Sequence, residues 1–220
     1  MVKTNVQKLL ISNLDALLAE KATFVKQYFY MNAVLLNHIA KYITLEASEI
    51  NLLESALSTQ KIKKKDHVLQ EGQICNTMYF ITKGCFRQYI INTKGNEQTL
   101  QFAIESWWIT DYLSYHNHVP SHFYIQAIEN SDIIAIEKPV LESLLIEIPK
   151  LERYFRIVSQ RTFGAAQMRI KFLFTMSAEE RFRLFNNLNP EFVQRVPQYM
   201  LASYLDFSAE FMSKIRAGKV

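Results

Sequence analysis

The feature that most constrains the fold is a central region in which short apolar runs are separated by glycines. Gly72, Gly84 and Gly95 recur about every 12 residues. Runs such as Phe86–Ile91 lie between them. Short runs with turn signals at this spacing are typical of an antiparallel β-sandwich or barrel. The segments on either side place their apolar residues at helical spacing instead. We therefore expect an α+β fold in which helices flank a β domain.

A long helix is predicted after the β region. Apolar and small residues recur there at alternating spacings of four and three, which gives a period of about 3.5. Such a period is typical of a seam that packs against another helix. An ordinary amphipathic helix packed on its own domain would produce a similar pattern, so both interpretations stay open. The seam positions are Leu151, Phe155, Val158, Thr162, Ala165, Arg169, Phe172 and Met176.

Near the C-terminus the chain has the pattern of two short helices joined by a tight turn. Leu201, Ala202 and Leu205 form an apolar face on the first helix, and Asp206 begins the turn. Ser208 can cap the second helix by accepting a backbone N–H. A small Ala at the crossing point, a turn of about three or four residues and a capped second helix indicate a helix-turn-helix.

Charge is distributed unevenly along the 220 residues. Residues 151–220 contain 11 Lys and Arg against 6 Asp and Glu, whereas the first 150 residues contain 14 against 15. A basic part after a near-neutral part fits a sensor joined to a domain that binds a polyanion. Chance scatter of surface charge would give the same totals. A composition of 49% hydrophobic and 21% charged residues excludes a disordered chain.

The first 30 residues are predicted to form an amphipathic helix, because Val6, Leu10, Leu14 and Leu17 fall on one stripe. This helix would cover either the following domain or a partner. The chain has no run of the ~18 apolar residues that a membrane span needs. It also has no apolar segment typical of a signal peptide. We therefore expect a cytoplasmic protein without membrane contact.

The two cysteines, Cys75 and Cys85, indicate neither a disulfide framework nor a CxxC metal site. Buried free thiols in a reducing cytosol are the simpler interpretation. Iron–sulfur sensing requires clustered cysteines, and two thiols ten residues apart cannot supply a cluster. The sequence therefore points to no cofactor.

In the order and spacing of these elements, the chain from about Met31 to Arg216 resembles a Crp/Fnr-type transcription regulator, especially members common in Bacteroidetes-like bacteria. The resemblance implies a β-roll (a jelly-roll-like double-stranded β-helix) in a cyclic-nucleotide-binding-like domain over residues 31–148. It further implies a dimerisation helix over 149–176 and a helix-turn-helix DNA-binding domain over 177–220. A full β-hairpin wing is not expected, because the sequence ends four residues after Arg216. The motifs that carry the resemblance are Tyr79-Phe-Ile-Thr-Lys-Gly84, Phe86-Arg87, Pro120-Ser121, Ser177-Ala-Glu-Glu-Arg181, Arg195-Val-Pro197 and Ala202-Ser-Tyr-Leu205.

The resemblance implies a ligand pocket but not a cyclic-nucleotide response. Thr110 and Asp111 stand where nucleotide-binding relatives have a Gly-Glu pair for the ribose, and Ser121 and His122 stand where they have Arg-Ser for the phosphate. No guanidinium at that position can pair bidentately with a cyclic phosphate. Arg87, from the Phe86-Arg87 motif, completes the set of candidate pocket residues. The effector, if there is one, stays unnamed.

The resemblance also implies a homodimer that reads double-stranded DNA, with recognition helices ~34 Å apart on a pseudo-palindromic operator. Candidate base contacts are Ser208, Ala209, Glu210 and Lys214, since a Glu can accept from cytosine and a Lys can donate to guanine. Asp206 stands where this turn usually has Gly, so it must tolerate a positive φ. The candidate phosphate contacts are Gln198, Ser213, Arg216 and Lys219.

An alternative function is a cupin-like β-roll that binds a small molecule or a metal without binding DNA. His116, His118 and His122 form an HxHxxxH pattern that could share a metal. Pro120 interrupts this segment and no further ligand is obvious, so we favour a solvated loop and expect no metal site. Catalytic Ser or Cys motifs are absent from the sequence, and we expect the protein not to be an enzyme.

Overall fold

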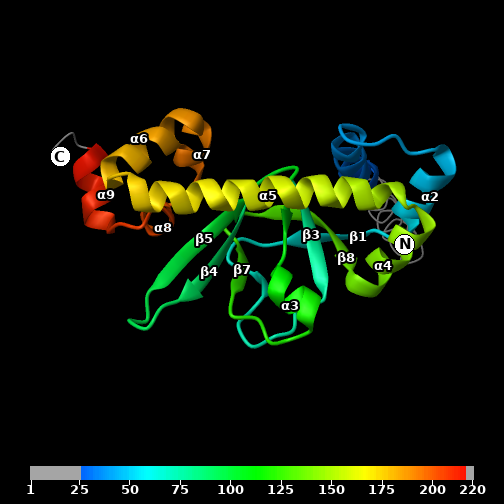
Figure 1. The fold of residues 1–220 in the computed structure, drawn as a ribbon, viewed down its shortest axis with the longest axis horizontal. Helices are drawn as coiled ribbons and strands as arrows, with labels where there is room; N and C mark the ends of the chain where they lie inside the picture. Colours follow the sequence, from blue (N-terminus) through cyan, green and yellow to red (C-terminus); the bar gives the residue numbers. More distant parts are fainter. Residues whose placement is uncertain (1–25, 217–220) are drawn as a thin grey trace, which may run out of the picture.

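The chain folds as helices, then a β-roll, then helices, in the order that the sequence predicts (Figure 1). The structure, a computed structural model, describes residues 26–216. The predicted helix over residues 1–30 lies mostly outside this range, and residues 26–30 begin a helix that continues to residue 40. The further helices are α2 (Ala47–Ser55), α3 (Tyr112–Asn117), α4 (Lys138–Glu147), α5 (Lys150–Thr175), α6 (Ala178–Leu188), α7 (Pro190–Arg195), α8 (Gln198–Leu205) and α9 (Ala209–Arg216).

The β-roll consists of two four-stranded antiparallel sheets, with strand orders β1-β8-β3-β6 and β2-β7-β4-β5. Neighbouring strands are mostly distant in sequence, as in a roll rather than a meander. The predicted α+β class with a β-roll is confirmed. The strands are β1 (Ser58–Ile62), β2 (His67–Leu69), β3 (Thr77–Lys83), β4 (Phe86–Ile91), β5 (Glu97–Ala103), β6 (Trp108–Ile109), β7 (Tyr124–Ala127) and β8 (Ser131–Glu137).

The inside of the roll is filled by side chains from both sheets. Ile81 and Ile133 of one sheet meet Phe86 and Ile125 of the other, and all four are fully buried. Successive strand residues point to opposite faces, so the β-branched residues at alternate positions share this interior. Packing of this kind gives the roll an apolar centre.

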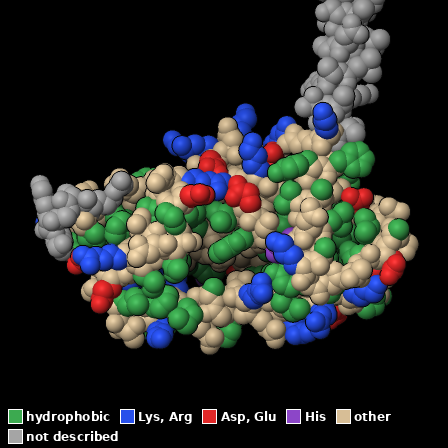
Figure 2. All heavy atoms as spheres, turned by 90° about the horizontal axis from the view of Figure 1, so that it is seen from above, with side chains coloured by type: hydrophobic (Ala, Val, Ile, Leu, Met, Phe, Trp, Pro, Cys, Tyr) green, Lys and Arg blue, Asp and Glu red, His purple; other side chains and the backbone are tan. Residues whose placement is uncertain are grey.

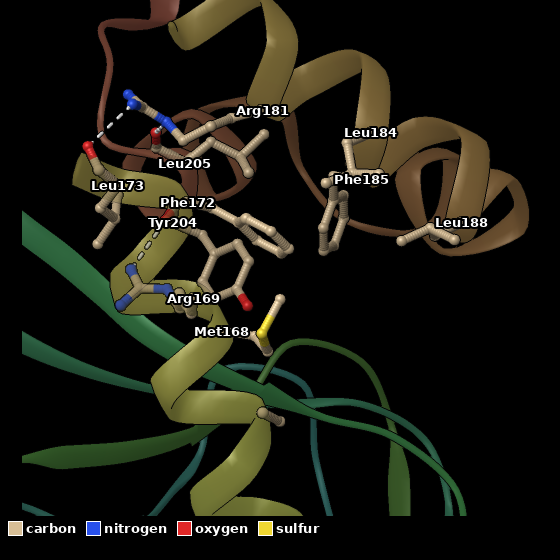
Figure 3. A pocket seen from close by; sticks show the side chains of 11 residues that line it. Met168, Arg169, Phe172, Leu173, Arg181, Leu184, Phe185, Leu188, Tyr204 and Leu205 are labelled. Carbon is tan, nitrogen blue, oxygen red and sulfur yellow. Dashed lines mark hydrogen bonds between the residues drawn. The ribbon is translucent and has the colours of Figure 1, made fainter. Parts of the chain in front are cut away.

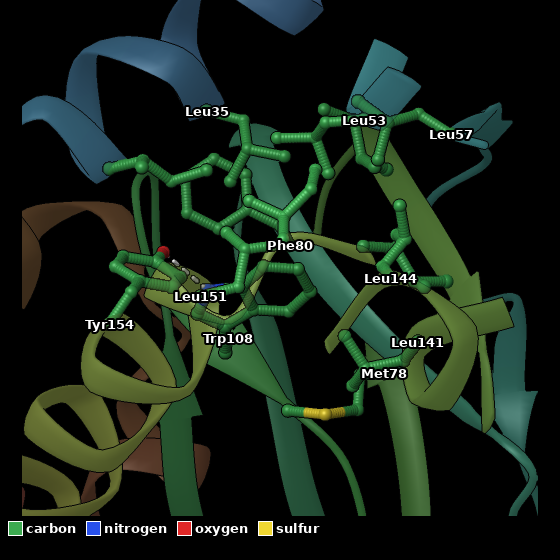
Figure 4. Close-up of a cluster of buried hydrophobic side chains, with 14 of the residues drawn as sticks. Leu35, Leu53, Leu57, Met78, Phe80, Trp108, Leu141, Leu144, Leu151 and Tyr154 are labelled. Atoms are coloured by element: carbon green, nitrogen blue, oxygen red, sulfur yellow. Dashed lines mark hydrogen bonds between the residues drawn. The ribbon is translucent and has the colours of Figure 1, made fainter. Parts of the chain in front are cut away.

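A second core joins the outer face of the first sheet to the helices (Figure 4). Phe80 and Trp108 of the sheet pack there against Leu35 of the N-terminal helix and Tyr154 of α5. The indole Nε1 of Trp108 donates to the hydroxyl of Tyr154 over 2.8 Å. That hydroxyl also lies 2.8 Å from Nδ1 of His38. These bonds satisfy the polar groups of a buried aromatic cluster and fix the first half of α5 on the roll.

The predicted seam of α5 is therefore partly an intrachain surface. Leu151 is buried in the second core, and Phe155 and Val158 pack against it. The 26-residue helix has the expected length, and this part of its seam packs on the chain's own domain. The reason is that the roll and the N-terminal helices already offer these residues an apolar surface.

The stretch from Trp107 to His122 contains strand β6 and helix α3, so the segment at His116, which the sequence predicts to be a solvated loop, is helical. The carboxylate of Asp111 caps α3 by accepting from the backbone N–H groups of Leu113 and Ser114, at 3.0 and 3.2 Å. An Asp at this position begins a helix because its side chain satisfies N–H groups that have no partner in the first turn. Local capping is the signal that the loop interpretation missed.

Gly84, in the turn between β3 and β4, is required by its surroundings. Its φ is +110°, and a Cβ at this position would lie 2.1 Å from Oγ of Ser131. Only glycine fits such a conformation and such a close approach. The Gly84 N–H donates to Oε1 of Glu105 over 2.8 Å, which positions that carboxylate for the contact with the C-terminal domain described below.

Candidate functional site

The predicted helix-turn-helix is formed by α8 and α9. Asp206 ends α8 in the left-handed conformation, with φ 62° and ψ 54°, where a glycine would be usual. The N–H of Phe207 then bonds to the carbonyl of Ala202 over 3.1 Å and closes the turn. Leu201, Ala202 and Leu205 are buried, as the apolar pattern predicts. The tolerance of Asp for positive φ is what allows this turn without glycine.

Helix α9 points one face into the protein and the other outward. Met212 is fully buried, and Oγ of Ser208 accepts from the N–H of Phe211 over 3.2 Å as the expected cap. The Phe211 ring packs edge-on against the Phe207 ring, 5.7 Å between centroids. The predicted DNA-contacting residues Gln198, Ser208, Glu210, Ser213 and Lys214 are exposed. The side chains of Ala209 and Arg216, and all of Lys219, lie outside the described part of the chain.

The first helix of the motif is docked on the edge of the roll. The Ser203 hydroxyl accepts from the Thr99 N–H over 2.8 Å and donates to the Glu97 carbonyl over 2.9 Å. A side-chain hydroxyl thus takes the place that a further strand would occupy beside β5. Phe102 of β5 packs against Phe192 and Tyr204 in the same interface.

Arg195 forms ion pairs with two carboxylates of the roll. Its Nη1 donates to Glu105 over 2.9 Å, and its Nε donates to Glu129 over 2.9 Å. Burial alone would raise the pKa of Glu105, but the hydrogen bonds from Arg195 and Gly84 outweigh it, so this pKa is lowered. The two carboxylates also raise the pKa of Arg195, and the guanidinium is charged at every physiological pH.

The C-terminal half of α5 presents an exposed apolar face. Phe163, Ile170 and Phe174 are 65%, 53% and 86% exposed. At about 100° per residue, these three positions fall within about 40° of one another around the helix. They lie opposite the face that carries Phe172 toward the body of the protein. Figure 2, which looks onto α5, shows hydrophobic side chains between clusters of charged ones on this side of the molecule.

Three of the predicted ligand-pocket residues lie together at the start of α3. Oγ of Ser121 donates to Oδ2 of Asp111 over 2.7 Å. Oγ1 of Thr110 donates to the Thr77 carbonyl over 3.0 Å and lies 3.2 Å from the thiol of Cys75. Thr110, Asp111 and Ser121 are all buried. Their hydrogen-bonding groups are thus engaged with other parts of the roll.

The two remaining predicted pocket residues are placed differently. Arg87 is buried on the other face of β4 from Gln88, whose amide reaches the Thr110 carbonyl. The guanidinium of Arg87 pairs with Glu97 over 2.6 Å and donates to Oε1 of Gln126. His122 is exposed in the loop before β7. The five residues therefore do not converge on one cavity.

The histidine and cysteine positions show no metal-binding geometry. Among residues 26–216, no group of three or more His, Cys, Asp or Glu side chains could hold a metal ion. His116 lies in α3, and His118 ends that helix in the left-handed conformation. Cys85 is fully buried, and this burial raises its pKa to about 12, so its thiol is protonated.

A pocket that the sequence analysis missed lies between α5, α6 and α8, and we call it the interhelix pocket (Figure 3). Its volume is about 250 Å³. Arg169 and Tyr204 are among its polar groups, and the Tyr204 hydroxyl points toward the space between Phe172 and Met168. The lining residues are Ala165, Met168, Arg169, Phe172, Leu173, Arg181, Leu184, Phe185, Leu188, Tyr204 and Leu205.

The roll matches a known domain family. Residues 59–147 match the cyclic nucleotide-binding domain family. The chain is 31% identical over 156 residues to the fumarate and nitrate reduction regulatory protein of Vibrio cholerae, an alignment that covers 69% of this chain. It spans 61% of the length of that relative. The relatives are named as regulators, not as enzymes.

Comparison with solved structures gives the same fold. The c-di-GMP-responsive global regulator CLP of Xanthomonas campestris superposes with a TM-score of 0.64 at 14% identity, covering 79% of this chain and 91% of that chain. FixK2 of Bradyrhizobium japonicum superposes with a TM-score of 0.62 at 14% identity, covering 74% of this chain and 83% of that chain. Such low identities show the fold. Within the described residues, no helix is both long and apolar enough to cross a membrane.

Proposed function

We propose that this chain, as a relative of the Crp/Fnr-type regulators, is a homodimeric transcription regulator that binds double-stranded DNA in the cytoplasm. The observation that carries the proposal is the helix-turn-helix at the C-terminal end of a cyclic nucleotide-binding domain, with the outer face of α9 exposed. A polar, accessible second helix is what a reader of the major groove requires. The basic C-terminal part of the chain supports binding to a polyanion.

The dimer would form along α5, with residues 149–176 as the dimerisation helix. Phe163, Ile170 and Phe174 offer an apolar stripe on one face, and a stripe of this kind is stabilised when a second copy covers it. Two copies related by a two-fold axis would present two copies of α9 on the same side. The operator would then be a pseudo-palindrome with half-sites ~34 Å apart.

Base contacts are proposed for α9. Ser208, Glu210 and Lys214 are exposed on it, and Ala209 belongs to the same first turn. Lys214 would donate to guanine and Glu210 would accept from cytosine. Gln198, Ser213, Arg216 and Lys219 are proposed as phosphate contacts, which position the protein without reading sequence.

We propose that the regulator does not respond to cyclic nucleotides. The side chains of Asp111 and Ser121 bond to each other and that of Thr110 bonds to the Thr77 carbonyl, so groups that would have to face a ribose and a phosphate are already engaged. Arg87 is the candidate pocket residue that carries a guanidinium. This group pairs with Glu97 and donates to Gln126, on the face of β4 that points away from Thr110. A bidentate phosphate contact would need a free guanidinium inside the roll.

Selection of bound sequences from random DNA tests the function and the symmetry of the operator together. A symmetric selected site, bound with a steep salt dependence, is the expected result. Loss of all binding at low salt would instead favour a small-molecule-binding roll whose helices serve only dimerisation.

Lys214→Ala tests whether Lys214 contacts a base or only the phosphate backbone. We expect it to weaken binding to the selected site by about 10- to 100-fold, and to weaken binding to bulk DNA much less. Lys94→Ala is the matched control, since Lys94 is an exposed lysine in the β4–β5 turn, on the roll. Equal losses on both DNAs would mean that Lys214 contacts only phosphate.

A further inference from the structure

We propose that the interhelix pocket binds a small amphiphilic carboxylate and that Arg169 is its anion anchor. The apolar part of the ligand would lie among Phe172, Phe185 and Leu188, which Figure 3 shows around the pocket. The carboxylate would lie at the guanidinium of Arg169, on the wall formed by α5. None of the residues that line this pocket belongs to the roll.

Arg169 is the residue of the pocket whose hydrogen-bonding groups are incompletely satisfied. Its Nη2 donates to the Tyr204 carbonyl over 2.9 Å, and its guanidinium lies 4.6 Å from the centre of the Tyr204 ring. Its Nε is buried and has no hydrogen-bond partner among the described residues. None of the ion pairs found between residues 26 and 216 involves Arg169. A buried donor without an acceptor is rare in proteins, and a carboxylate that reached Nε after a small shift of the Arg169 side chain would satisfy it.

Arg181, the other arginine of the pocket, has a different role. It donates to the carbonyls of Leu205 over 3.0 Å and of Met176 over 2.8 Å. Its Nη2 also reaches the Asp206 carbonyl, at 3.3 Å. These carbonyls end α5 and α8, where the last turn of a helix has no internal donor. Arg181 therefore holds the wall of the pocket, and Arg169 alone is left to meet the anion.

The size of the pocket limits the ligand. Its volume of about 250 Å³ exceeds the ~150 Å³ of an apolar cavity that takes up benzene. It is smaller than the ~300–1,000 Å³ of sites for drug-sized ligands. A carboxylate with a medium-length alkyl chain or one aromatic ring fits between these limits, whereas a cyclic nucleotide, with its polar base and ribose, finds few polar groups here.

The site would couple the ligand to DNA reading, a consequence that rests on the proposed function. The pocket joins α5, the proposed dimerisation helix, to α8, the first helix of the DNA-binding motif. A ligand that binds one relative placement of these helices better than another shifts their equilibrium. Its affinity would then be linked to the affinity for the operator.

The test is isothermal titration calorimetry on the full chain with decanoate, below its micelle-forming concentration, and with decan-1-ol as the uncharged match. We expect one decanoate per protomer and binding of decan-1-ol that is at least about 10-fold weaker. Arg169→Gln should weaken decanoate by about 10-fold and leave decan-1-ol unchanged. Arg183→Gln, on the exposed face of α6, should change neither.

Ala165→Phe keeps the test decisive if Arg169→Gln does not fold. Ala165 lines the pocket from an exposed position, so a larger side chain there fills the pocket and should abolish binding of both probes. Equal affinity for the two probes, or decanoate binding that survives Ala165→Phe, would overturn the proposal. An absence of binding combined with a change of oligomeric state in Ala165→Phe would show that a second copy of the chain covers the pocket, and would also overturn it.

The regulatory consequence is tested separately with the DNA sequence selected above. Decanoate should change the affinity of the parent protein for that site, and should not change the affinity of Arg169→Gln. Binding of decanoate without any change in DNA affinity would overturn the coupling. Failure of the parent protein to bind any DNA would count against the proposed function and leave the calorimetric result standing.

Discussion

The interior of the roll and the interhelix pocket differ in whether their buried polar groups have hydrogen-bond partners. In the roll, Asp111 accepts from two N–H groups and from Ser121, and the surrounding side chains leave a closed core. In the interhelix pocket, Nε of Arg169 is buried without a partner beside an open apolar space. The region that matches the cyclic nucleotide-binding domain family, residues 59–147, thus has a packed interior, and the residues that line the interhelix pocket lie outside that match. Fold similarity alone does not locate a ligand site.

The largest expected contrast is in stability. Phe80 is fully buried in the core shown in Figure 4, so Phe80→Ala should lower the free energy of unfolding by about 3–5 kcal/mol. Leu188 lines the interhelix pocket but is 68% exposed, and Leu188→Ala should change that free energy by no more than about 0.5 kcal/mol. Urea denaturation of both variants measures the difference. Similar losses would mean that the pocket is part of a closed core.

A smaller effect is expected at the start of α3. Asp111→Ala removes the helix cap and leaves the Ser121 hydroxyl without its acceptor, so it should cost about 1–3 kcal/mol of unfolding free energy. Asp66→Ala, at an exposed turn of the same roll, is the control and should cost about 0.5 kcal/mol or less.

The role of Asp111 separates structure from ligand binding. If it serves the fold, Asp111→Ala destabilises the apoprotein without any ligand present, as chemical denaturation would detect. A variant that keeps full stability would contradict the account of a filled roll. It would return Asp111 to the set of ligand-binding residues predicted from the sequence.

The sequence predicts well what depends on short-range patterns. The glycine-punctuated strands, the 26-residue helix and the turn at Asp206 follow from spacing, capping and backbone preference, which act between neighbours. Helix α3 is not predicted, because the histidine pattern with Pro120 favours a loop, although Asp111 is visible in the sequence as a cap. Its signal was local and was given too little weight.

What the sequence could not predict depends on contacts between distant segments. The spacing of the seam residues predicts that α5 packs against an apolar surface but not which one. Phe155 and Val158 could pack equally well on a second copy of the chain or on the chain's own roll. Arg87 lies in a recognisable motif, and only the strand register shows that it faces away from Thr110. The interhelix pocket is built from three helices, and no spacing along one of them reports an empty space between them.

The smallest expected effect concerns the ion pairs that Arg195 forms with Glu105 and Glu129, which join the DNA-binding motif to the roll. Glu105 accepts from Arg195 and from Gly84, and its pKa is lowered from the ordinary value of 4.5. A lowered pKa in the folded state means that the carboxylate stabilises the fold above pH 4.5 and that this contribution is lost as the pH falls through the lowered value. The Glu105 side chain is 38% exposed, so solvent screening limits the effect.

We therefore expect Glu105→Gln to lower the free energy of unfolding by about 1 kcal/mol or less at neutral pH. The difference from the parent should shrink toward zero as the pH falls through the lowered pKa of Glu105, because the parent carboxylate is then itself protonated. Glu142→Gln on the exposed side of α4 is the control and should show no such pH dependence. A difference in unfolding free energy that stays constant at acid pH would mean that the Glu105–Arg195 contact stabilises the fold through packing rather than charge. Docking of the DNA-binding motif on the roll would then depend on Ser203 and the aromatic contacts of β5.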